Sequence, residues 1–517
     1  MALQVSPALP DRFRPTGITV TSLAWVGAIV GVALVLLSGA ALTMYWPLLP
    51  VAALAAVLVV AWCIQRPSRW VYLLITTIYL ESSDLSFYVG GARVRPAQIL
   101  LLPIVFCTLM QGIAGSVRLR RVPLMIPLLV YLGCNFVSTA LSPVPDQCLK
   151  ISLLLTSLVL VYAVTYTLVR DDPAAWPSLF RFFVIVGLIE IVIGYYQVAA
   201  GYANALLGLS LPIGHLGMIH ADYIGTIFGR PYGTLPEPDT FGAVCVLYSL
   251  LLGLMWLTAS VPRTMKRLTP LTAVAAIGGL LVGIVRAAWF GFLFGLLWIV
   301  FMHLTGRLRG IRPLRVAAVI GLAALTGAVS LTSPRVQKVL IGRFTQGPGD
   351  IQATLSKENA RYVQMAMSWR LFRERPVFGN GPGSFSVLGW MGANEFYYLT
   401  VGVERRLIYD PSILTTVLND TGVVGSAAFL VLVAAYFGRV RRRLRRIAGR
   451  SSRNQALAAH CAMVGLFASF IFTQYFWLPF TWLFLAMTML LLEFGGITPA
   501  TNHGQSENGT PAASPVL

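Results

Sequence analysis

Three arginines far apart in the sequence, Arg230, Arg286 and Arg361, are expected at one boundary of the membrane-spanning part of the chain. A guanidinium group offers a planar fork of donors that binds phosphate oxygens in pairs, and it stays charged at physiological pH. That boundary is expected to be the outer one, and basic residues in outside loops have no role in setting topology. We therefore hypothesise that the three arginines form a diphosphate-binding site; contacts with lipid headgroups and structural ion pairs are the alternatives.

Carboxylates that could transfer a proton are expected at the same boundary: Glu237, Asp239, Asp410 and Asp420. Any of them could act as a general base if its pKa and its reach were suitable. Structural roles compete with this one, because Asp239 directly precedes a span and would suit a helix N-cap. Asp420 would suit a cap or a helix–helix hydrogen bond, which leaves Glu237, Asp239 and Asp410 as the candidate bases.

Glu190 differs from these carboxylates because it falls inside an expected span, near residues 180–200. An acidic side chain within a membrane is costly and often functional, but it can also bond a neighbouring helix. The histidines of an outer loop, His215 and His220, match no metal-binding spacing. The sequence has no phosphate-binding loop and no dinucleotide fingerprint, so a cytosolic nucleotide-dependent reaction is not expected.

The elements that would position these residues are transmembrane helices. Of the 517 residues, 57% are hydrophobic and only 11% are charged, and the mean hydropathy is +0.75. A helix needs about 20 apolar residues to cross a bilayer, and the apolar blocks predict about fourteen such spans. The predicted fold class is an all-α polytopic membrane protein with a large extracytoplasmic loop that carries amphipathic helices.

Basic residues cluster in alternate short loops, and this pattern predicts which side of each helix faces the cytoplasm. The net charge of +20 is thereby explained without a nucleic-acid partner, and both termini are expected in the cytoplasm. The six cysteines lie in or beside apolar spans without metal-ligand spacing, so disulfides and zinc are not expected. The clearest clusters are Arg118, Arg120 and Arg121, then Arg307, Arg309, Arg312 and Arg315, then Arg439, Arg441 to Arg443, Arg445 and Arg446.

The expected organisation alternates membrane and extramembrane parts. The second outer loop covers residues 201–238 and the large extracytoplasmic loop covers residues 333–411, where an amphipathic segment would form a lid over a site at the membrane boundary. The other parts are a cytoplasmic segment at 1–17, a helix bundle at 18–332, further transmembrane helices at 412–494, and a cytoplasmic tail at 495–517 that is expected to be disordered.

Four different motifs follow one another along the chain. The first is an arginine with a Gly-Thr motif before a helix start, and the second is an arginine at a helix junction. The third is a series of Arg, Trp and Pro-x-x-Gly-x-Gly, and the fourth is an acidic residue before glycines. They stand here as Arg230 with Gly233-Thr234-Leu235 and Glu237-Pro238-Asp239, as Arg286, as Arg361 with Trp369 and Pro376 to Gly381, and as Asp420 with Gly422 and Gly425. Together they resemble the O-antigen ligase and polymerase superfamily of integral-membrane enzymes.

This resemblance implies a membrane glycosyltransferase of surface-polysaccharide biosynthesis with a GT-C-like architecture, in the inner membrane of a bacterium. Its reaction would need no metal, nucleotide or other cofactor. Its partners would be a polyprenyl-diphosphate-linked glycan, an acceptor glycan, membrane lipids and polysaccharide-assembly machinery. The ligases of the superfamily have a histidine where this chain has Pro411. A repeat-unit polymerase is therefore favoured over a ligase.

Two other classes of protein are compatible with the composition. A flippase for lipid-linked oligosaccharides or a solute carrier would also have many helices and buried charges, but such transporters often show internal repeats, and this sequence has none that we detect. A non-catalytic assembly protein would leave the three arginines without a common purpose.

Overall fold

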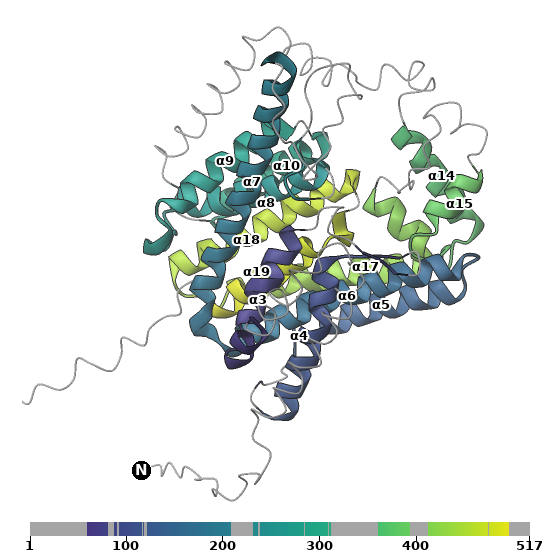
Figure 1. Cartoon of the computed structure of the whole chain (residues 1–517), viewed down its shortest axis with the longest axis horizontal. Helices are drawn as coiled ribbons and strands as arrows, with labels where there is room; N and C mark the ends of the chain where they lie inside the picture. Colours follow the sequence, from purple (N-terminus) through teal and green to yellow (C-terminus); the bar gives the residue numbers. More distant parts are fainter. Residues whose placement is uncertain are drawn as a thin grey trace, which may run out of the picture.

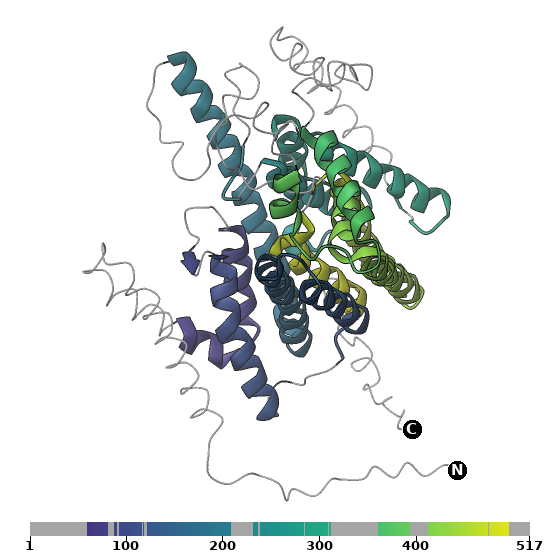
Figure 2. The same cartoon turned by 90° about the vertical axis from the view of Figure 1, so that its right-hand side faces the viewer.

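The computed structural model describes residues 59–80, 87–89, 92–115, 117, 121–207, 231–235, 238–283, 285–308, 310–311, 360–392, 412–473 and 475–495. These parts of the chain are almost entirely helical (Figures 1 and 2). Two three-residue strands, β1 (Phe87–Val89) and β2 (Ala92–Val94), form an antiparallel hairpin in which Phe87 pairs with Val94. The all-α prediction is therefore confirmed apart from this small hairpin.

Each expected span within the described residues is a helix. The expected spans at 18–39 and 316–332, and most of the one at 45–64, lie outside them, as do the polar segments 1–17 and 496–517. The main helices are α3 (Arg69–Tyr79), α4 (Pro96–Ile113), α5 (Met125–Ala140), α6 (Pro145–Asp171), α7 (Trp176–Leu207), α8 (Pro238–Leu257), α9 (Leu268–Gly283), α10 (Arg286–Leu304), α14 (Ala360–Glu374), α15 (Phe385–Gly392), α17 (Ile413–Leu444), α18 (Arg450–Ser469) and α19 (Pro479–Phe494).

The chain is a multi-pass membrane protein by helix length and hydropathy. Among the described residues, 7 helices are long and apolar enough to cross a bilayer, and α5, α9 and α19 are shorter apolar helices. The long spans are Pro96–Ile113, Pro145–Asp171, Pro173–Gly201, Pro238–Leu257, Arg286–Leu304, Ile413–Leu444 and Arg450–Phe472.

The centre of the bundle is formed by α8 and α18. In each of them 83% of the most apolar 18-residue stretch is buried, against 33% of the corresponding stretch in α4 and α10. The helices around them approach closely at glycines: a Cβ added to Gly291 of α10 would lie 2.6 Å from the Gly465 carbonyl oxygen of α18, and one added to Gly279 of α9 would lie 2.7 Å from Cys245 Sγ of α8. Small residues at crossings are typical of helix packing in membranes.

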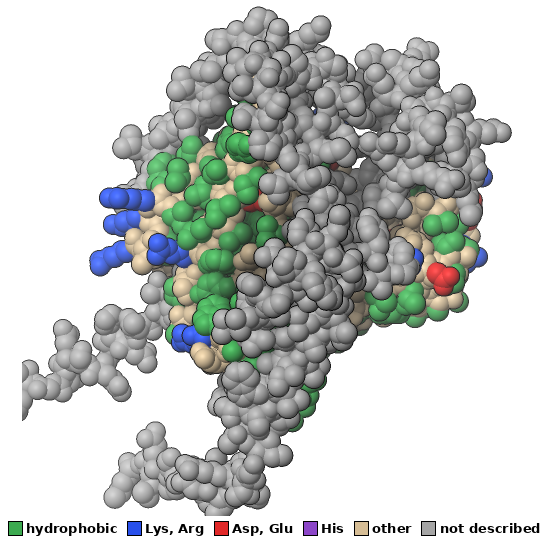
Figure 3. Space-filling view, in the orientation of Figure 1, with side chains coloured by type: hydrophobic (Ala, Val, Ile, Leu, Met, Phe, Trp, Pro, Cys, Tyr) green, Lys and Arg blue, Asp and Glu red, His purple; other side chains and the backbone are tan. Residues whose placement is uncertain are grey.

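The outer helices expose large apolar side chains, as expected of surfaces that face lipid. Figure 3 shows hydrophobic side chains covering much of the described surface in that view, with a group of Lys and Arg side chains at the left edge and others at the right. Exposed examples on α4, α5, α10 and α17 are Leu102, Ile126, Leu297 and Leu430.

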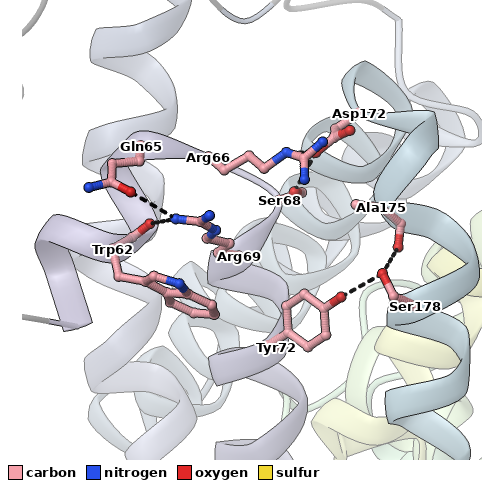
Figure 4. Close-up of polar contacts among 9 residues, drawn as sticks. All are labelled: Trp62, Gln65, Arg66, Ser68, Arg69, Tyr72, Asp172, Ala175 and Ser178. Carbon is pink, nitrogen blue, oxygen red and sulfur yellow. Dashed lines mark hydrogen bonds and ion pairs between the residues drawn. The ribbon is translucent and has the colours of Figure 1, made fainter.

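Acidic and basic side chains meet at one end of the bundle, which we call the basic end. Arg66 Nε lies 3.1 Å from Asp172 Oδ2, and the Ser68 hydroxyl donates to the same oxygen at 2.7 Å (Figure 4). These contacts join the start of α3 to the end of α6. Three arginines surround Glu493 of α19: Arg170 at 3.2 Å, Arg439 at 3.6 Å and Arg443 at 2.6 Å.

The prediction that basic loops share one side is consistent with this arrangement. The Gln455 side chain of α18 donates to the Ser260 carbonyl oxygen in the α8–α9 connection at 2.6 Å, and Gly310 after α10 lies against the Arg450 guanidinium. The ends of α6, α8, α10 and α17 therefore lie with the starts of α9 and α18. The remaining ends of α3, α8, α10 and α17 form the far end of the bundle.

Candidate functional site

The N-termini of α8 and α10 lie against each other at the far end. A Cβ added to Gly242, in the second turn of α8, would lie 2.9 Å from Ala288 Cβ and 3.1 Å from Val285 Cβ. Asp239 lies one turn before Gly242, and Arg286 lies between the two contact residues of α10. The fold therefore places these two predicted site residues on adjoining helix starts, although 47 positions separate them in the sequence.

Arg286 begins α10 at a tight junction between helices. Val285 has an extended backbone, with φ −100° and ψ 105°, and the Trp289 indole N–H donates to the Leu280 carbonyl oxygen at 2.8 Å, which holds α10 against the end of α9. The Arg286 side chain is exposed. The prediction that Arg286 stands at the junction of two helices without room for a loop is confirmed.

Asp239 lies inside α8 rather than before it. The helix begins at Pro238, so the carboxylate belongs to the first turn, where the alternative interpretation of an N-cap does not apply. Proline suits the first helical position because its missing N–H would have no helical partner there. A carboxylate in the first turn is stabilised by the helix dipole, and this side chain is half-buried.

A short non-helical segment, residues 231–235, runs inside the bundle between α3, α7 and α8. All five of its residues are buried. Non-helical backbone at membrane depth needs partners supplied by the protein, and Gln197 of α7 supplies several: its Oε1 accepts from the N–H groups of Tyr232 and Gly233 at 2.9 Å each, and its Nε2 donates to the Gly233 carbonyl at 2.8 Å.

Glu190 holds the next part of the segment, one residue further along. Its Oε1 accepts the Thr234 N–H at 2.8 Å, and its Oε2 lies 2.5 Å from Thr234 Oγ1. The same hydroxyl donates to the carbonyl oxygen of Tyr79, the last residue of α3. Gly233 has φ +64°, and an added Cβ would overlap the Glu190 carboxylate. Only glycine fits at this position without displacing Glu190.

The segment enters the bundle and returns. Gly194 of α7 lies against the Phe241 ring of α8, and Gly187 lies against the Tyr248 ring, so the two helices run antiparallel. By this alignment α8 begins near the level of Gln197. Seven residues of helix separate Gln197 from Glu190, which corresponds to about 10 Å along the axis. The segment therefore descends to Glu190 before α8 starts.

The structure describes only some of the predicted site residues. Arg230, which directly precedes the buried Pro231 in the sequence, lies outside the described residues, as do Glu237 and Asp410. Arg361 is the second residue of α14, and the placement of its side chain is not described. Of the six predicted site residues, the structure therefore brings together Asp239 and Arg286, beside the segment that follows Arg230.

The described part of the large loop packs on α17. In α14, Ser368 Oγ donates to the Thr415 carbonyl of α17 at 3.3 Å, and Arg375, just past its end, donates to the Leu141 carbonyl at 2.7 Å. Figure 1 shows α14 and α15 beside α5 and α17, away from α9. The predicted lid over the site remains a prediction, because residues 333–359 and 393–411 lie outside the described residues.

Two of the sequence motifs interlock in this region. The turn at residues 376–381 pairs with a kink in α17: the N–H groups of Asn380 and Gly381 donate to the carbonyls of Asn419 and Asp420 at 2.7 and 3.0 Å, and the Val423 N–H donates to the Pro376 carbonyl at 2.8 Å. The Ser138 hydroxyl also donates to the Asp420 carbonyl, at 2.5 Å. These bonds use the backbone carbonyl of Asp420, whereas its carboxylate, on a residue that is 2% exposed, accepts from the Asn419 side-chain amide at 3.4 Å.

Sequence reasoning missed Gln197 and the attachment of Glu190 to the 231–235 segment. The signal was present, because Glu190 and Gln197 are seven residues apart and so share one face of a helix. Two polar side chains in one stripe of an apolar span indicate a buried polar partner, but the identity of that partner depends on the fold.

The site is thus defined by Arg286, Asp239 and the 231–235 segment at the far end of the bundle. Comparison of the chain with protein-family models and with curated proteins finds no match in either set.

Proposed function

We propose that this protein is a membrane glycosyltransferase that transfers or polymerises a glycan carried on a polyprenyl diphosphate, during the biosynthesis of a surface polysaccharide such as O-antigen, exopolysaccharide or capsule. The proposal rests on one observation above others: the packing of Gly242 on Val285 and Ala288 joins the starts of α8 and α10, so that Asp239 and Arg286 share one end of the bundle. Arg230 adjoins this region in the sequence.

The proposed reaction uses charge and position without a cofactor. The bond between the anomeric carbon and the diphosphate oxygen breaks, and an acceptor hydroxyl oxygen forms the new glycosidic bond. Arg230, Arg286 and Arg361 would bind the diphosphate and stabilise the negative charge that it gains on leaving. Asp239 would take the proton of the acceptor hydroxyl, with Glu237 and Asp410 as the other candidates for this base.

The sidedness of the bundle supports an orientation for this chemistry. Basic loops face the cytoplasm in most membrane proteins, so the basic end would be cytoplasmic and the Arg286 end extracytoplasmic, in the inner membrane of a bacterium. The donor would then present its diphosphate at the outer boundary of the membrane, where Arg286 is exposed. A GT-C-like architecture, which the sequence resemblance implies, is part of this proposal.

The decisive experiment is transfer in proteoliposomes that contain the purified protein and a lipid-linked oligosaccharide. Arg286→Ala and Arg230→Ala are expected to lower transfer on the order of 10²-fold, because each removes a charge that stabilises the leaving group. Arg441→Ala is the matched control: this exposed arginine lies near the end of α17 at the basic end, and its loss should leave transfer unchanged.

The products distinguish the candidate functions. Chain growth from the donor alone, with release of polyprenyl diphosphate, supports a polymerase, and dependence on a separate acceptor supports a ligase. Movement of the donor across the membrane without a new glycosidic bond would replace the proposal with a transporter. Transfer that is unaffected by both arginine substitutions at normal protein levels would reject the diphosphate site.

A further inference from the structure

Thr234 Oγ1, Glu190 and the end of α3 form a polar cluster inside the membrane that the proposed reaction does not use directly. Thr234 Oγ1 lies within hydrogen-bonding distance of two oxygens, the Tyr79 carbonyl oxygen and Glu190 Oε2. Tyr79 is the last residue of α3, where helix carbonyls have no partner within the helix. The Glu190 side chain is 2% exposed.

The protons of this cluster can be counted. Two close oxygen–oxygen contacts in a row need two protons, and a threonine hydroxyl carries one. The carbonyl oxygen of Tyr79 can only accept, so the Thr234 proton belongs to that contact. We assign the second proton to Glu190 Oε2, which would then donate to Thr234 Oγ1 while Glu190 Oε1 accepts from the Thr234 N–H.

The surroundings of Glu190 agree with a neutral carboxyl group. Its hydrogen-bond partners are the N–H and the hydroxyl of Thr234, and the ion pairs found among the described residues do not include it. An ionised carboxylate without a cationic partner is expensive to place at membrane depth. A protonated one can donate and accept at once, as this geometry requires.

We propose that Glu190 is a protonated positioning residue that fastens the 231–235 segment to α3 and α7, and so fixes the chain that leads from Arg230 to α8. The role in glycan transfer rests on the proposed function, whereas the attachment itself does not. Glu190 makes no contact with a reacting atom in this scheme. It acts through the backbone of Gly233 and Thr234, together with Gln197.

Infrared difference spectroscopy tests the protonation directly. At neutral pH the full-length protein should show the carbonyl stretching band of a protonated carboxylic acid that is absent from Glu190→Gln. Glu374→Gln, which removes an exposed carboxylate at the end of α14, should not remove such a band. If Glu190→Gln removes only the bands of an ionised carboxylate, the proposal is wrong.

Accessibility tests the attachment without reference to activity. A cysteine placed at Leu235, which is 3% exposed, should react slowly with a membrane-impermeant maleimide in the otherwise native chain and in Glu190→Gln, whose amide can also donate and accept. Labelling should be faster in Glu190→Ala and in Thr234→Val, whereas Thr234→Ser should protect. The chain without the added cysteine reports any labelling of the native thiols. Equal labelling in Glu190→Ala and the native chain would overturn the attachment.

Transfer assays then connect the cluster to the reaction. Glu190→Ala should lower transfer on the order of 10²-fold by displacing the chain beside Arg230, and Glu190→Gln should restore most of it. Labelling and infrared results as expected, without any transfer by the native chain, would reject the proposed function and leave the attachment standing. Faster labelling in Glu190→Ala with unchanged transfer would reject the positioning role alone.

Discussion

Two irregular pieces of backbone in the described part of the chain are held in different ways: residues 231–235 are all buried, whereas the 376–381 turn is exposed at 376–378 and buried at 379–381. Residues 231–235 depend on the side chains of Glu190 and Gln197, which provide most of the partners of the segment. The turn at residues 376–381 depends on backbone pairing with the kink of α17, where the carbonyls of Asn419 and Asp420 are the acceptors. The first region adjoins the proposed site, and the second anchors α14 and α15.

The difference concerns which substitutions each region can tolerate. Backbone pairing is independent of side-chain identity except where a side chain would block the approach, so glycines determine the second region. Side-chain attachment depends on the polar groups of Glu190 and Gln197 within an apolar helix, so a change at either residue should affect residues 231–235. The 376–381 turn should therefore be most sensitive to changes at its glycines, and the 231–235 segment to changes at the polar side chains that hold it.

The largest effect is expected for Gly422→Ala in the kink of α17. Gly422 has φ 62° and ψ −161°, a backbone conformation essentially restricted to glycine, and an added Cβ would overlap the Val377 carbonyl. Backbone strain and overpacking together should lower the free energy of unfolding by roughly 2–6 kcal/mol. Gly438→Ala in the same helix is the control, because nothing lies within 4 Å of its added Cβ. Thermal unfolding in detergent compares the two variants, and equal midpoints would contradict the anchor.

Gly233→Ala should have the next largest effect. The added methyl group would displace the Glu190 side chain, which can move more easily than backbone, so we expect a loss of about 1–3 kcal/mol. Gly253→Ala in α8, where an added Cβ meets nothing within 4 Å, is the matched control. Faster maleimide labelling at a Leu235→Cys position should accompany the loss. Unchanged labelling would show that Glu190 does not depend on the close approach of Gly233.

Gln197→Leu should weaken the first region by about 1–3 kcal/mol, because the buried N–H groups of Tyr232 and Gly233 would lose their acceptor. Gln197→Glu keeps an acceptor for the two N–H groups, but when ionised it cannot donate to the Gly233 carbonyl. Its loss of stability should lie between those of the native chain and Gln197→Leu only if the new carboxyl group is protonated. Urea or thermal unfolding of the full chain measures both. An effect below that of Ser142→Ala would contradict the importance of the side-chain attachment.

The smallest effect is expected for Ser142→Ala in the second region. Its hydroxyl donates to the Asn380 carbonyl at 2.5 Å, and removal of one such bond should cost about 1 kcal/mol. The backbone bonds of Asn380 and Gly381 to α17 would remain. Protease digestion between α14 and α17 should therefore change little, and a large increase in cleavage would show that side chains also control this anchor.

Much of the fold was accessible from the sequence because hydrophobic length determines which segments cross a bilayer. The expected spans near 97–112, 149–169 and 288–304 correspond to α4, α6 and α10. The arginine at the α9–α10 junction was likewise predictable, since two adjoining apolar blocks leave no residues for a loop. The small hairpin of β1 and β2 was missed, because its few residues carry no clear alternating pattern.

The candidate site was accessible only in part. Arg286 and Asp239 could be assigned to one boundary from the alternation of basic loops, which is a rule about sides of the membrane. That rule does not specify which helix ends lie next to each other on one side of the membrane. The contact of Gly242 with Val285 and Ala288 decides that α8 and α10 adjoin, and it depends on how two glycine-containing helix surfaces pack.

The sequence alone determined that this is a multi-pass membrane protein, where most of its helices lie, and which residue types could bind a diphosphate. Local composition suffices for these conclusions, because each apolar block must satisfy the bilayer by itself. Tertiary structure alone decided that Glu190 and Gln197 hold residues 231–235, and that the 376–381 turn pairs with α17. Those contacts join segments far apart in the chain, and packing selects them from many partners that composition leaves equally possible.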